Sequence, residues 1–182
     1  MLARILFAGS GGQGVLTIGN ILGNAAMLQD FHVTFLPEYG AAMRGGTANC
    51  TICISDEEIA SPVASNPDIV LALNQPSVIS FINRLQPGGQ LIFNSSIVDD
   101  LPSRGDIGTF AVPASQLAQD INDIRSTNMI ILGSFVKLAN LVTIKKVHES
   151  VDVLMGGKKK VAESVKNAIS LGYDRFPFEE TT

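Results

Sequence analysis

A glycine-rich turn near the start of the chain is the clearest candidate for chemistry. It reads Gly9-Ser10-Gly11-Gly12-Gln13-Gly14 and follows the apolar run Ile5–Ala8. Gly9, Gly11 and Gly14 fit the spacing G-x-G-x-x-G between an expected strand and an expected helix. Backbone N–H groups at such a turn, together with the start of the helix, can hold a phosphate. The turn therefore predicts an anionic or nucleotide-like ligand, and a structural tight turn is the alternative.

An ordinary NAD(P) site needs more than this turn. Dinucleotide-binding folds place an acidic residue at the end of the second strand, where it binds the ribose. Glu38 is the nearest candidate, but Pro37-Glu38-Tyr39-Gly40 indicates the start of a loop rather than the end of a strand. Gln13 also places a polar amide among the glycines. These residues favour an anionic ligand other than NAD(P), and a stand-alone NAD(P)-dependent oxidoreductase stays open as an alternative.

A second candidate, Arg44-Gly45-Gly46, ends a loop expected over residues 37–46. The guanidinium is a planar donor that suits phosphate or carboxylate, and the glycines let the backbone come close to a ligand. Arg44 is one of only five basic side chains in the first 136 residues. We therefore expect Arg44, Gly45 and Gly46 to bind an anionic group; a turn arginine paired with Glu38 is the alternative.

The two cysteines do not predict a metal or redox site. Cys50 and Cys53 lie in a strand-like run, where alternation places them on opposite faces. No further cysteine completes a four-ligand site, and the histidines are only His32 and His148. We therefore expect buried packing cysteines. The sequence also lacks a Ser-His-Asp, paired-carboxylate or metal-ligand pattern, so we predict no catalytic residue and no bound metal.

Alternating strands and helices must position these motifs. Apolar periodicity predicts helices over 14–28, after Pro76, after a cap at Ser115, and over 127–142, 146–155 and 158–171. The expected strands are 5–8, 32–36, 47–55, 68–73, 90–94 and 107–112. This alternation predicts an α/β fold: a three-layer, doubly wound, mostly parallel, Rossmann-like sheet with C-terminal helices. The length suits a single domain over residues 1–182.

Composition and charge limit the partners. Apolar residues make up 46% and charged residues only 16% of the chain, which fits either a compact core or a surface covered by other subunits. A net charge of −4 argues against nucleic acid. Residues 137–176 hold eight basic and four acidic side chains, which indicates a solvated helix surface or contact with an anionic partner. We find no signal peptide or membrane span and expect a cytoplasmic protein.

Several motifs occur together in a recognisable order. They are Gly11-Gly12-Gln13-Gly14-Val15, Pro37-Glu38-Tyr39-Gly40, Met43-Arg44-Gly45-Gly46-Thr47, Ile59-Ala60-Ser61-Pro62 and Pro67-Asp68. In this order and spacing the chain resembles the gamma subunit of the 2-oxoacid:ferredoxin oxidoreductases, through at least residues 4–112. Asn94-Ser95-Ser96 is among the segments most similar to the 2-oxoglutarate branch, with pyruvate or a branched-chain 2-oxoacid as alternatives. Ala41-Ala42 departs from the bulkier or acidic residue that relatives often carry before the Met-Arg pair.

The resemblance implies a non-catalytic subunit of a hetero-oligomeric enzyme. Such enzymes decarboxylate a 2-oxoacid on thiamine diphosphate, pass electrons through iron–sulfur clusters to ferredoxin, and transfer the acyl group to coenzyme A. This chain has neither the thiamine signature nor cluster cysteines, so thiamine diphosphate, magnesium and the clusters are implied on alpha and beta subunits, with or without a ferredoxin-like delta subunit. The low charge of Met129–Val142 would fit burial against these partners. The resemblance implies that this subunit shares a coenzyme A site; the alternative is a pure assembly module with a vestigial turn. The implied residues of the coenzyme A site are Gly9, Gly11, Gly12, Gln13, Gly14, Arg44, Gly45 and Gly46.

Overall fold

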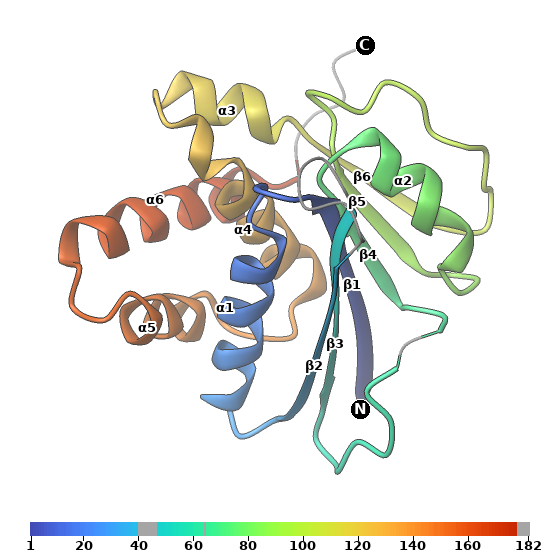
Figure 1. The fold of residues 1–182 in the computed structure, drawn as a ribbon, viewed down its shortest axis with the longest axis horizontal. Helices are drawn as coiled ribbons and strands as arrows, with labels where there is room; N and C mark the ends of the chain where they lie inside the picture. The colour runs from blue at the N-terminus through green and yellow to red at the C-terminus, as the bar shows by residue number, and fades with distance from the viewer. Residues whose placement is uncertain (40–46, 64, 178–182) are drawn as a thin grey trace.

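A six-stranded mixed sheet forms the centre of the chain, in the order β2-β3-β1-β4-β5-β6 (Figure 1). The computed structural model describes residues 1–39, 47–63 and 65–177. Strands β1, β4, β5 and β6 are parallel, whereas β3 runs antiparallel to both β1 and β2. Among the described strands only β3 is reversed, and the predicted α/β fold with a mostly parallel sheet is confirmed. The bounds are β1 (Leu2–Ser10), β2 (His32–Tyr39), β3 (Thr47–Ser55), β4 (Ile69–Ala72), β5 (Gln90–Asn94) and β6 (Gly108–Val112).

Helices cover both faces of this sheet and make three layers (Figure 1). Side chains alternate along β1, so Ile5 and Phe7 join one core while Leu6 and Ala8 join the other. The first core is covered by α1 (Val15–Met27), α3 (Ala114–Asp120), α4 (Thr127–Ala139), α5 (Ile144–Leu154) and α6 (Lys159–Arg175). The second is covered by α2 (Gln75–Phe81) and the short 3-10 helix η1 (Ile82–Arg84); a further 3-10 turn, η2 (Ile124–Ser126), leads into α4.

The cysteines of β3 pack on opposite faces of the sheet, as predicted. Cys50 Sγ lies 3.8 Å from the carbonyl oxygen of Val15, on the side of α1. Cys53 Sγ lies 3.8 Å from the carbonyl oxygen of Pro62, in the segment that follows β3. Both are buried free thiols. Burial raises the pKa of the Cys50 thiol to about 12, so this group is not a thiolate near neutral pH.

Helices α4 and α6 cross with their backbones almost in contact. A methyl group on Gly172 would come within 1.8 Å of the Ile130 carbonyl oxygen, so only a glycine fits there. On its other side α4 packs on the sheet, where the rings of Phe135 and Phe7 meet edge to face at 5.2 Å. The expectation that partner subunits bury Met129–Val142 is therefore corrected, because the sheet and α6 already bury most of α4 within this chain.

Two local predictions differ from the structure. Pro113 precedes the first turn of α3, and Ser115 does not cap the helix but accepts a hydrogen bond from Asn94 Nδ2 at 2.8 Å. Strand β2 continues to Tyr39, so Glu38 lies in the strand rather than in the loop. Pro37 is tolerated because β2 is at the edge of the sheet and needs no second partner strand. None of the described helices is both long and apolar enough to cross a bilayer.

Candidate functional site

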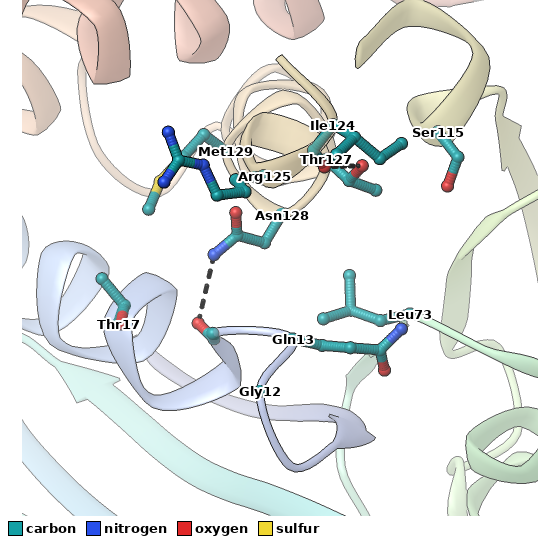
Figure 2. Close-up of a pocket in the computed structure, with 11 residues that line it drawn as sticks. Gly12, Gln13, Thr17, Leu73, Ser115, Ile124, Arg125, Thr127, Asn128 and Met129 are labelled. Carbon is teal, nitrogen blue, oxygen red and sulfur yellow. Dashed lines mark hydrogen bonds between the residues drawn. The ribbon is translucent and has the colours of Figure 1, made fainter. Parts of the chain in front are cut away.

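The glycine-rich turn borders a cavity of about 490 Å³ at one edge of the sheet. The parallel strands β1, β4, β5 and β6 all end at this edge, which is where α/β folds bind their ligands. The walls come from the turn, the first turn of α1, the end of β4, α3, η2 and the start of α4 (Figure 2). The lining residues are Gly12, Gln13, Gly14, Thr17, Leu73, Ser115, Ile124, Arg125, Thr127, Asn128 and Met129.

Two helix N-termini meet at this cavity. Helix α1 begins at Val15, directly after the turn, and α4 begins at Thr127. The first N–H groups of a helix carry partial positive charge and have no partner within the helix. At α4, however, the preceding turn η2 already binds the Thr127 N–H through the Ile124 carbonyl oxygen. Neither helix has an acidic side chain in its first turn, and of the eleven described residues that line the cavity only Arg125 carries a formal charge. The arrangement suits an anionic group such as a phosphate.

Glycine is favoured where the turn approaches α4. Gly14 has a φ of +71°, in the left-handed region, and forms the N-cap of α1. Its carbonyl oxygen accepts a hydrogen bond from Asn128 Nδ2 at 3.4 Å, the dashed line in Figure 2. A Cβ atom at position 14 would lie only 2.3 Å from that nitrogen. A side chain at position 14 would therefore force the Asn128 amide to move away from this wall of the cavity.

The side chain of Gln13 is held by hydrogen bonds at its oxygen. Oε1 accepts from the backbone N–H of Ser10 and from Asn74 Nδ2, both at 2.7 Å. Asn74 Nδ2 also donates to Ser10 Oγ at 2.9 Å, and Asn74 Oδ1 caps α2 by accepting from the Ser77 N–H at 3.0 Å. These bonds join the turn after β1 to the turn after β4.

Three of the predicted residues of the first motif line the cavity: Gly12, Gln13 and Gly14. Gly9 and Gly11 do not. Gly9 lies in β1, where a Cβ atom would come within 2.8 Å of Val15 Cγ2 and 2.9 Å of Gln13 Oε1, so the missing side chain makes room for both. Gly11 is exposed in the turn itself.

The second predicted motif, Arg44-Gly45-Gly46, lies outside the described residues and stays a prediction. The residue that follows it, Thr47, begins β3 and is the register partner of Ser10, the last residue of β1. The chain therefore re-enters the sheet directly beside the glycine-rich turn.

The wall formed by η2 and α4 was missed from the sequence. Arg125 has a side chain that is 94% exposed and lies 3.8 Å from Asp123, an exposed pairing that holds it only weakly. Thr127 and Asn128 open α4. The signal was present, because a polar run, Arg125-Ser126-Thr127-Asn128, directly precedes an apolar one and is typical of a helix start.

The strand order separates Glu38 from the turn. In a dinucleotide-binding fold the second strand neighbours the first, so that its terminal acid reaches the ribose. Here β3 lies between them: Glu38 pairs with Asn49, and Asn49 pairs with Ala8. Two strand spacings amount to about 10 Å. The geometry therefore does not support an NAD(P) site. Among the described residues, no group of His, Cys, Asp and Glu side chains is placed to hold a metal ion.

Comparison with known proteins places these features in one family. The model of the pyruvate ferredoxin/flavodoxin oxidoreductase family matches residues 4–175. The 2-oxoglutarate synthase subunit KorC of Methanothermobacter marburgensis is 32% identical over 158 residues, covering 83% of this chain and 85% of KorC. The ketoisovalerate oxidoreductase subunit VorA of Methanothermobacter thermautotrophicus is 34% identical over 161 residues, covering 88% of this chain; the match spans only 33% of VorA.

A solved structure agrees over nearly the whole chain. The gamma subunit of a keto/oxoacid ferredoxin oxidoreductase from Geobacter sulfurreducens PCA has a TM-score of 0.83 and 28% sequence identity, with 96% of this chain and 95% of that chain covered. The family match, the agreement with KorC and the shared fold all concern the same span of residues. This chain therefore belongs to the pyruvate ferredoxin/flavodoxin oxidoreductase family, in which its relatives include separate gamma subunits.

Proposed function

We propose that this chain is the gamma subunit of a multi-subunit 2-oxoacid:ferredoxin oxidoreductase. The complex would decarboxylate a 2-oxoacid oxidatively, form the acyl-CoA and reduce ferredoxin. We favour 2-oxoglutarate as the substrate, because the match with KorC, a subunit of a 2-oxoglutarate synthase, covers 83% of this chain and 85% of KorC. Pyruvate or a branched-chain 2-oxoacid is the runner-up, since VorA, a ketoisovalerate oxidoreductase subunit, has a similar identity but is a much longer protein.

The role of this chain would be assembly and a share of the coenzyme A site. The observation that carries this proposal is the meeting of two helix N-termini, a glycine-rich turn and Arg125 at a cavity whose described lining residues include no acid. Coenzyme A carries phosphates, which suit backbone N–H groups and a guanidinium. Thiamine diphosphate, magnesium and the iron–sulfur clusters would be held by alpha and beta subunits, with or without a ferredoxin-like delta subunit.

The second motif would complete this site. Thr47 pairs with Ser10, at the end of β1 and beside the glycine-rich turn. Arg44, Gly45 and Gly46 directly precede Thr47 in the sequence. We propose that Arg44 supplies a second guanidinium to the same phosphate-bearing ligand.

Co-purification tests the assignment to a complex. We expect this chain, expressed with its neighbouring genes and purified through a tag, to bring with it a subunit that binds thiamine diphosphate. The purified complex should reduce ferredoxin when given coenzyme A and 2-oxoglutarate. If no such subunit co-purifies, the proposal is wrong. A higher kcat/KM with pyruvate or 3-methyl-2-oxobutanoate would move the substrate assignment to the runner-up.

Arginine substitutions in the complex test the coenzyme A site. A hydrogen bond to a charged group contributes about 1.5–3 kcal/mol, so Arg125→Ala and Arg44→Ala should each raise the KM for coenzyme A at least about tenfold. The kcat at saturating coenzyme A should be unchanged. Lys160→Ala, which removes an exposed positive charge on α6, is the matched control. If both arginine variants match this control, the chain serves assembly alone.

A further inference from the structure

Two side-chain amides in series connect the start of α2 to the cavity. Asn74 follows β4, is only 9% exposed and forms the N-cap of α2. Its Oδ1 accepts a hydrogen bond from the Ser77 backbone N–H. A backbone N–H can only donate, so this bond fixes which end of the Asn74 amide is oxygen. The nitrogen end is thereby directed at Gln13, 2.7 Å from its Oε1.

The orientation of the Gln13 amide is fixed in the same way. Its Oε1 accepts from Asn74 Nδ2 and also from the Ser10 backbone N–H, again a group that can only donate. Rotating this amide by 180° would set its nitrogen against two donors and forfeit both bonds. The Gln13 nitrogen must therefore occupy the opposite side of the amide.

The nitrogen of Gln13 faces the cavity. Figure 2 shows it on the side of Leu73 and Ser115, with the oxygen turned away from them. No hydrogen bond joins Gln13 Nε2 to any of the described residues. An amide nitrogen carries two N–H groups and no acceptor lone pair, so the cavity is offered donors at this point and nothing that repels an anion.

We propose that Gln13 Nε2 donates to a phosphate oxygen of coenzyme A and that Asn74 is the positioning residue that fixes this direction of donation. The inference rests on the proposed function. It assigns a role to Asn74, which does not line the cavity, and it gives Gln13 a defined polarity. The phosphate is the acceptor we favour, because Arg125 and the N-terminus of α1 lie at the cavity and none of its described lining residues is acidic.

Two near-isosteric variants of the complex test the proposal. Gln13→Glu keeps an oxygen for Ser10 and Asn74 but replaces the donor that faces the cavity by a carboxylate oxygen. Asn74→Asp keeps the N-cap of α2 but presents an acceptor to Gln13 Oε1. Only the Ser10 N–H then still favours the original orientation of the Gln13 amide, so the Gln13 nitrogen is no longer held toward the ligand from both sides. Gln119→Glu is the matched control, because Gln119 is exposed on α3 and does not line the cavity.

The readouts are the Kd for coenzyme A from calorimetry on the purified complex, together with KM, kcat and the thermal unfolding midpoint. We expect Gln13→Glu and Asn74→Asp to raise Kd and KM about ten- to hundredfold, the range for a lost hydrogen bond to a charged group. The kcat at saturating coenzyme A should stay near the wild-type value for both variants. The unfolding midpoint should stay near wild type for Gln13→Glu and fall for Asn74→Asp, because Asn74 is only 9% exposed and its nitrogen donates to Gln13 and Ser10. The rise in Kd should shrink as salt is added, because the contact is to a phosphate.

Each opposite result is informative. If Gln13→Glu binds coenzyme A like Gln119→Glu while Arg125→Ala weakens binding, the proposed coenzyme A site stands and the donor role of Gln13 is wrong. If Gln13→Glu raises the Kd for coenzyme A but Asn74→Asp leaves it unchanged, Gln13 acts without Asn74 and the positioning role is overturned. A rise in Kd that is independent of salt would exclude a phosphate as the acceptor. If neither Gln13→Glu nor Arg125→Ala changes Kd, both the inference and the site fail.

Discussion

The variant Gly14→Ala tests the close approach of the glycine-rich turn to α4. Two costs follow from the structure. An alanine held at a φ of +71° pays about 1–2 kcal/mol for the left-handed conformation. Its Cβ would also lie 2.3 Å from Asn128 Nδ2, so Asn128 must move and give up its hydrogen bond to the residue 14 carbonyl, which costs up to about 1 kcal/mol more.

The total is about 1–3 kcal/mol, which corresponds to a fall of roughly 2–12 °C in the unfolding midpoint for a chain of this size. Urea denaturation and thermal melting of the full chain measure it. Gly12→Ala is the control, because Gly12 has a φ of +92° but open space around the added atom, so only the conformational cost of about 1–2 kcal/mol applies.

A double-mutant cycle separates the two costs. Asn128→Ala removes the hydrogen bond to the Gly14 carbonyl, but Asn128 Oδ1 has no hydrogen-bond partner among the described residues, so this variant should itself cost no more than about 1 kcal/mol. In that background Gly14→Ala should be no worse than Gly12→Ala, because the colliding nitrogen is gone. If Gly14→Ala costs the same with and without Asn128, or the same as Gly12→Ala in the wild-type chain, the close contact described for this wall of the cavity is wrong.

Two further predictions concern titrating groups away from the cavity. Burial, and then the nearby Lys166, lower the pKa of His148 from its ordinary 6.5. As the pH falls, the unfolded state therefore binds this proton before the folded state does, and the stability of the fold should decline below about pH 6.5. In melting experiments from about pH 7.5 to 5.5, the unfolding midpoint of His148→Gln should fall less steeply with pH than that of the wild-type chain. An unchanged slope would contradict this. Because burial raises the pKa of the Cys50 thiol to about 12, iodoacetamide at pH 8 should label Cys50 only after unfolding in urea, as read by mass spectrometry. Labelling of Cys50 in the folded chain would refute its inert packing role.

The elements of this fold could be predicted from local patterns, but their spatial order could not. Strands over 47–55 and 90–94 were predicted with the bounds that the structure has, because apolar residues and bounding turns mark them within the sequence itself. The insertion of β3 between β1 and β2 leaves no such mark, since neighbours in a sheet need not be neighbours in sequence. Glu38 was set aside because it was expected in a loop, whereas it lies in β2 and is kept from the turn by β3.

The same limit applies to the cavity. Gly12, Gln13 and Gly14 could be singled out because glycine spacing after an apolar strand is a local signal. Arg125 and Asn128 lie more than a hundred residues later and reach the cavity only because α4 packs across the sheet with its N-terminus at the same edge. A sequence pattern that marks the start of a helix predicts a partially positive N-terminus there. It does not predict which other turn of the fold that N-terminus will face.

The contact between α4 and α6 has a mechanical consequence for recognition. Where Gly172 meets Ile130, backbone lies against backbone with no side-chain rotamers between them to rearrange. Ser134 Oγ adds a hydrogen bond to the Gly172 carbonyl oxygen at 3.1 Å. The two helices are therefore expected to move as one rigid body, and the α4 wall is already in place when a ligand arrives. The ordering cost of binding then falls on the exposed Arg125 side chain and on the turn, rather than on the helices that aim their N–H groups at the cavity.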